Sequence, residues 1–158
     1  MIPECTLLRL HLQHKVILQL IEEMTDEDLN KPFIAGKWSV FDNVVHLAVY
    51  QHTFIKRIKT IVEENEPRFE RYVAENDPLF EIQRKLTFGE VWNDLLEARE
   101  EIEKGLLKLS MQDLQKTGLH PGYGKMNVLQ WTEFFLLHEA HHLYTIFGLC
   151  GEWRKLKQ

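Results

Sequence analysis

The sequence is short of the features that would place it in several common classes of protein. Only two of its 158 residues are cysteines, Cys5 and Cys150. They form no CxxC pair, and there is no further cysteine to complete a disulfide framework or a zinc knuckle. Because stable disulfides are rare in a reducing compartment, we expect two free thiols.

Excess positive charge and long apolar runs are also missing. The chain has 19 Lys and Arg against 24 Asp and Glu, a net charge of −5. Proteins that bind nucleic acid usually carry a basic face, so no nucleic-acid partner is expected. No uncharged run approaches the ~20 apolar residues that cross a bilayer, and the first residues lack the pattern of a signal peptide. The sequence predicts a cytoplasmic protein without a membrane partner.

Proline and glycine are sparse, at five and eight residues, and most lie outside four long segments. In each segment apolar residues recur at i, i+3 and i+4, whereas the alternation typical of strands is not seen. We predict helices over about Cys5–Met24, Ser39–Glu64, Thr87–Leu109 and Asn127–Leu149. The fold class predicted is all-α, a four-helix bundle in which residues 1–158 form a single domain.

The connections between the helices have their own signals. Residues 65–85 combine prolines, charges and aromatic residues, and we interpret them as a long crossover between helices two and three. Residues 118–125 contain Pro121-Gly122-Tyr123-Gly124 and are predicted to be a loop. Ser39, three residues before Asp42, predicts a capping box that starts helix two. Thr25–Asp28 similarly predicts a capped short turn.

The most informative cluster is Leu137-His138-Glu139-Ala140-His141-His142 in the fourth helix. His138 and His142 are one turn apart on a face that also holds apolar residues, so both imidazoles point inward. Burying two imidazoles costs desolvation twice unless each finds a partner, and one divalent cation serves both. A metal site is favoured over the alternative of two hydrogen-bonded core histidines.

A third ligand is expected from another helix, because two imidazoles seldom hold a catalytic metal alone. His46, in helix two, is the candidate, although it lies at the flank of the apolar stripe and could be a boundary histidine. His11, His14 and His52 have charged neighbours and are weaker candidates. His120 is expected to be a solvated loop residue.

The segment His138–His142 also matches the HExxH pattern of zinc proteases. Its extended form requires Gly at position 145 and His at position 148, where this chain has Thr145 and Gly148. The variant with a glutamate ligand needs a carboxylate well downstream, but Glu152 is within ten residues of His142. We therefore do not expect a peptidase.

Taken together, Trp38-Ser39-(x)2-Asp42-(x)3-His46-Leu47 and His138-(x)3-His142 resemble the DinB/YfiT-like family of metal-dependent enzymes. The resemblance covers essentially the whole chain. It implies a four-helix bundle in which His46, His138 and His142 bind one divalent metal, zinc or nickel. Many members continue after the last ligand with an Arg-Gly-Gln-like run, whereas this chain has Leu143-Tyr144-Thr145.

Rise per residue gives a test of the topology. His46 is about 10 Å from the start of helix two, whereas His138 and His142 are about 10–17 Å from the end of helix four. The three meet only if helices two and four are antiparallel. An up-down-down-up bundle, which the long crossover permits, satisfies this condition and places Cys5 and Cys150 at opposite ends.

The resemblance further implies an activity on a small molecule. The leading hypothesis is a transferase that activates a low-molecular-weight thiol for attack on an electrophile, as in detoxification. Metal-dependent hydrolysis at the same site, and a non-catalytic stress-response or binding module, are the alternatives. Asp42, Tyr50 and Glu139 are candidates for supporting the ligands, no catalytic base is assigned, and a homodimer is possible.

Overall fold

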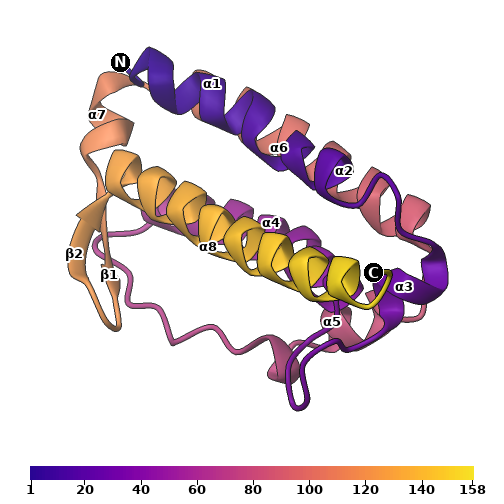
Figure 1. Ribbon diagram of the computed structural model, residues 1–158. Helices are drawn as coiled ribbons and strands as arrows, with labels where there is room; N and C mark the ends of the chain where they lie inside the picture. Colours follow the sequence, from indigo (N-terminus) through magenta and orange to yellow (C-terminus); the bar gives the residue numbers. More distant parts are fainter.

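The structure, a computed structural model, describes residues 1–158 and is built around four long helical segments (Figure 1). The first segment consists of α1 (Glu4–Leu12) and α2 (Val16–Leu20). The others are α4 (Val40–Glu63), α6 (Phe88–Leu107) and α8 (Val128–Lys155). The remaining elements are short: α3 (Asp26–Asn30), α5 (Pro78–Gln83), α7 (Met111–Gln115), β1 (Thr117–His120) and β2 (Gly124–Asn127). None of the helices is long and apolar enough to cross a membrane.

The four segments form a bundle with the predicted up-down-down-up order. The α1–α2 segment and α8 run in one direction, and α4 and α6 run in the other (Figure 1). The chain between α4 and α6 therefore returns along the length of the bundle before α6 begins. Helices α4 and α8 pack against each other as antiparallel neighbours. Cys5 lies at the start of α1 and Cys150 near the end of α8, which runs in the same direction, so the two are toward opposite ends, and both are free.

Capping boxes start most of the helices. The Ser39 hydroxyl accepts a hydrogen bond from the Asp42 amide at 3.0 Å, and the Asp42 carboxylate accepts one from the Ser39 amide at 3.0 Å. Equivalent boxes begin α3, α6, α7 and α8. Each box satisfies amide groups that a helix terminus leaves without partners. These local signals explain why the predicted helix starts are confirmed.

The first segment is not the continuous helix that the spacing over Cys5–Met24 predicts. Residues Gln13–Lys15 form a turn of 3₁₀ helix between α1 and α2. At this point a guanidinium nitrogen of Arg99 donates to the Leu10 carbonyl at 2.9 Å. Leu10 is the acceptor that residue 14 would use in an α-helix, and a side chain inserted into this ladder is a known cause of helix breaks.

The predicted loop at residues 118–125 is also corrected, because this region forms an antiparallel β-hairpin. Gly118 pairs with Met126 and His120 with Gly124. Each strand has four residues and buries only one of them, so no alternating pattern identified it. Helix α8 likewise extends six residues beyond the predicted end, to Lys155.

Gly118 fixes the hairpin against α4. A Cβ atom at this position would lie 2.8 Å from Ile61 and 2.9 Å from Phe69. We expect Gly118→Ala to lower the free energy of unfolding by about 1–3 kcal/mol, because the packed side chains would have to move. Gly122→Ala is the control, since its Cβ would have no neighbour closer than 3.7 Å. Urea denaturation would compare the two variants, and equal midpoints would contradict the close packing.

Candidate metal centre

The structure brings together the three histidines that the sequence singles out. His46 comes from α4, and His138 and His142 come from α8. One ring nitrogen from each residue lies within 4.8 Å of the other two. The Nε2 atoms of His46 and His138 are 3.0 Å apart. The antiparallel packing of α4 and α8 therefore produces one cluster of imidazoles at the helix interface.

Burial keeps these imidazoles uncharged. It lowers the pKa of His46 to about 3, that of His138 to about 2 and that of His142 to about 4. The neighbouring histidines contribute to each shift, because one positive charge disfavours another nearby. At neutral pH all three rings are consequently neutral, which is the form that binds metals.

The donor set fits a divalent cation. Neutral imidazole suits zinc, copper, iron and nickel. Two imidazole nitrogens that each lie about 2.0–2.1 Å from one zinc ion are themselves roughly 2.9–3.4 Å apart, and the observed 3.0 Å lies in this range. Three protein ligands would leave at least one coordination position open, as in catalytic rather than structural zinc sites.

Asn43 orients one of the three rings, and the sequence analysis missed it. Its side-chain oxygen accepts a hydrogen bond from Nδ1 of His142 at 2.8 Å, while its amide nitrogen donates to the Ser39 carbonyl at 2.8 Å. The second bond fixes which way the Asn43 amide points. His142 therefore carries its proton on Nδ1 and presents the lone pair of Nε2. The position of Asn43 three residues before His46, on the same helical face, could have revealed it.

Aromatic side chains surround the cluster. The ring centroid of Trp38 is 5.1 Å from that of His46, and the centroid of Tyr72 is 5.7 Å from it. Tyr50 lies 4.3 Å from His138 by the same measure, and Phe134 lies 6.4 Å from it. Tyr72 belongs to the crossover, which thus covers the cluster. These rings limit the access of water from the helix interface.

The three residues considered as supporting groups have other partners. The Asp42 carboxylate caps α4 and accepts a hydrogen bond from Arg84 at 2.8 Å. The Tyr50 hydroxyl accepts one from Arg57 at 3.2 Å, although its ring contacts the cluster. Glu139 is almost completely buried and forms an ion pair with Arg99. None of the three directs a free carboxylate or hydroxyl toward the imidazoles.

The position of Glu139 also bears on the HExxH match. In a zinc protease the glutamate of this motif faces the metal as a general base. Here the Glu139 carboxylate accepts hydrogen bonds from Arg99 and Gln13, so it is not free to act as that base. The structure thus agrees with the expectation that this pattern does not mark a peptidase.

Two of the remaining histidines differ from their predicted environments. His14, expected to have charged neighbours, is buried, and burial together with Arg99 lowers its pKa to about 3. His120 lies in β1, packs 4.8 Å from Phe134, and its Nδ1 accepts hydrogen bonds from two turn amides. His52 bonds to Asp94 at 2.9 Å, and His11 lies 3.4 Å from Glu103. None of these four joins the cluster.

Thr145 is at the position where the resemblance to the DinB/YfiT-like family leads us to expect glutamine. Its hydroxyl donates to the His141 carbonyl one turn earlier, at 3.0 Å. The side chain therefore bonds to its own helix.

Comparison with known proteins gives a consistent picture. The sequence profile of the DinB superfamily matches residues 9–146. A protein of Oceanobacillus iheyensis that bears the name "Putative metal-dependent hydrolase OB0782" is 27% identical over 141 residues, which are 86% of this chain and 78% of that protein.

Two solved structures share the fold. YfiT from Bacillus subtilis, described as a probable metal-dependent hydrolase with an unusual four-helix bundle topology, has a TM-score of 0.74 at 23% identity, covering 92% of this chain and 84% of its own. The four-helix bundle protein TT2238 has a TM-score of 0.65 at 24% identity, covering 89% and 94% respectively. The all-α bundle predicted from the sequence is thereby confirmed.

The assignment of Glu139 to the core rather than to the chemistry can be tested by mutation. Glu139→Ala is expected to lower the free energy of unfolding by about 3–5 kcal/mol, because it leaves the Arg99 guanidinium buried without its counter-ion. Glu101→Ala, on the exposed side of α6, should change it by less than about 0.5 kcal/mol. Urea denaturation measures both. An unchanged midpoint for Glu139→Ala would return this carboxylate to the candidates for catalytic base.

Proposed function

The chain belongs to the DinB superfamily, and on this basis we propose that it is a metal-dependent hydrolase whose divalent cation is held by His46, His138 and His142. The observation that carries the proposal is the convergence of three neutral imidazoles from two helices. Zinc or nickel is the proposed metal, since both accept nitrogen ligands. The relative from Oceanobacillus iheyensis, which is named for this class of activity, supports the proposal.

Each part of the site has a role in this function. A divalent cation in this ligand set would lower the pKa of a water molecule and so supply a nucleophile at neutral pH. The three histidines supply the donor atoms, and Asn43 holds His142 in the required tautomer. The aromatic rings reduce the access of bulk water to the cluster. The substrate is proposed to be a small molecule, and residues 1–158 to act as one domain.

Thiol transfer, the leading hypothesis from the sequence, would use the same three ligands. Glutathione and bacillithiol carry carboxylates at neutral pH, and binding them calls for cationic side chains. No lysine or arginine lines the groove beside His138. For this reason we propose hydrolysis ahead of thiol transfer as the activity. A requirement for added thiol in turnover would reverse the order.

Metal content tests the ligand set. Protein purified without a metal-affinity tag and reconstituted with zinc or nickel should hold about one equivalent by inductively coupled plasma mass spectrometry. His46→Ala, His138→Ala and His142→Ala should each reduce this sharply, because each removes one ligand. His52→Ala is the control on the same helix as His46, since its ring bonds to Asp94. Retention of the metal by His46→Ala would overturn the three-histidine site.

Asn43 provides a second test of the same site. Asn43→Ala should weaken zinc affinity about 10–100-fold, which is typical when a group that orients a ligating histidine is lost. Asn43→Asp should recover part of the affinity, because its carboxylate can still accept a hydrogen bond from Nδ1 but cannot donate to the Ser39 carbonyl. Competition with a chromophoric chelator measures both variants. Equal affinities in wild type and Asn43→Ala would show that His142 is oriented by packing alone.

A further inference from the structure

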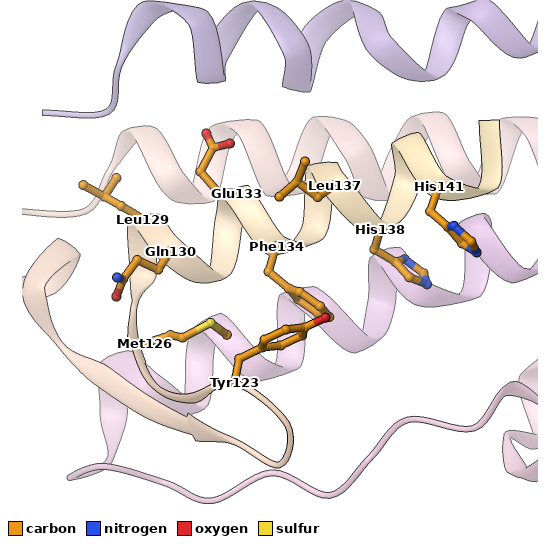
Figure 2. A pocket seen from close by; sticks show the side chains of 9 residues that line it. All are labelled: Tyr123, Met126, Leu129, Gln130, Glu133, Phe134, Leu137, His138 and His141. Atoms are coloured by element: carbon orange, nitrogen blue, oxygen red, sulfur yellow. The ribbon is translucent and has the colours of Figure 1, made fainter. Parts of the chain in front are cut away.

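A groove of about 700 Å³ runs beside the histidine cluster, between the β1–β2 hairpin and α8. Figure 2 shows the Tyr123 ring beside Phe134, with His138 and His141 further along α8. A volume of this size falls in the range of sites for small molecules. The groove is therefore a candidate binding site in its own right.

The groove leads to the proposed metal site through a shared residue. His138 lines the groove, and its Nε2 atom is also the one that lies 3.0 Å from Nε2 of His46. His141, one turn from His138, is exposed at the same end. A molecule lying in the groove would thus have one end at the cluster and its body along α8.

The lining is apolar and offers no free charge to a ligand. Most of its surface comes from aromatic and aliphatic side chains, and neither lysine nor arginine contributes. The Glu133 carboxylate lines the groove, but it already accepts hydrogen bonds from Thr6 at 2.6 Å and Arg9 at 2.7 Å. The Gln130 oxygen caps α8 by accepting from the Asn127 amide at 2.9 Å. The remaining donors in the lining belong to Gln130, Tyr123 and His141, none of which carries a permanent charge, so an ionised group on a ligand would exchange its hydration for weaker partners.

We propose that this groove binds an uncharged small molecule with an aromatic or aliphatic body, whose polar, hydrolysable group lies at the His138 end. Tyr123 and Leu137, which are 68% and 61% exposed, would be covered by this ligand. The placement of the ligand's hydrolysable group at His138 rests on the function proposed above. The binding of its apolar body does not, because that binding depends only on the groove.

The experiment uses the neutral dye Nile red, whose fluorescence rises in apolar surroundings, with protein as purified and after treatment with EDTA. Binding by both forms is expected. Tyr123→Ser and Leu137→Asp should each weaken it about tenfold, because each removes apolar contact area. The matched controls are Tyr144→Ser and Leu107→Asp, whose side chains are 77% and 64% exposed and lie outside the groove. Equal losses in variants and controls would overturn the proposal.

Competition then tests the preference for an uncharged ligand. Methyl 2-naphthoate and the 2-naphthoate anion have the same rings and differ in charge. With EDTA-treated protein the ester should displace Nile red at a concentration at least about tenfold lower than the anion. Displacement by the anion at equal concentration would contradict the inference. Ester binding without hydrolysis by the zinc-loaded protein would count against the proposed function and leave the groove assignment standing.

Size-exclusion chromatography separates this proposal from a subunit interface. If wild type is a dimer that does not bind Nile red, and Leu137→Asp makes it monomeric, a second copy of the chain covers the groove and the inference fails. If wild type binds the dye and has the same oligomeric state as Leu137→Asp, no second copy covers the groove and the inference is supported.

Discussion

One buried guanidinium joins all four helical segments of the bundle. Arg99, on α6, donates to the Leu10 carbonyl of α1, to the Gln51 side chain of α4 and to the Glu139 carboxylate of α8. Buried ion pairs of this kind add little net stability, because desolvation offsets the attraction. Their effect lies in specificity, since any other rotation of the helices would leave a charge without a partner. Glu139 directly follows His138, so its pairing with Arg99 sets which face of α8 turns toward α4.

The direction of α4 is the second condition for the site. His46 lies six residues after the start of α4, about 9 Å along its axis. It meets His138 and His142 because the crossover returns the chain to the end where α4 began, so that α6 runs parallel to α4 and α8 antiparallel to it. In a bundle with short connections, α4 and α8 would run parallel, and the ligands would lie at different heights. The crossover thus contributes to the site in two ways. It permits the antiparallel packing of α4 and α8, and it supplies Tyr72, whose ring packs against His46.

The features predicted correctly from the sequence are those with local or periodic causes. Ser39 and Asp42 form a capping box through neighbouring atoms, and the i, i+4 spacing alone places His138 and His142 on one face. The antiparallel order followed from requiring that His46 reach them. The missed features depend on contacts between distant residues: Arg99 interrupts the first helix at Leu10, and Ile61 selects glycine at position 118. The burial of His14 follows from the same interruption, which no spacing pattern reveals.

The electrostatics of the candidate site are consistent with the uncharged substrate proposed for the groove. The three imidazoles bring no charge, and the two carboxylates considered as supporting groups, Asp42 and Glu139, are held by Arg84 and Arg99. Because neutral imidazoles do not offset its charge, a divalent cation held there would strongly polarise the polar group of a substrate bound beside it. A groove with its own cations would draw anions that compete for that position. The apolar lining instead favours molecules whose charge develops only during reaction, and the affinity of the proposed ligand would come from the body that lies along α8.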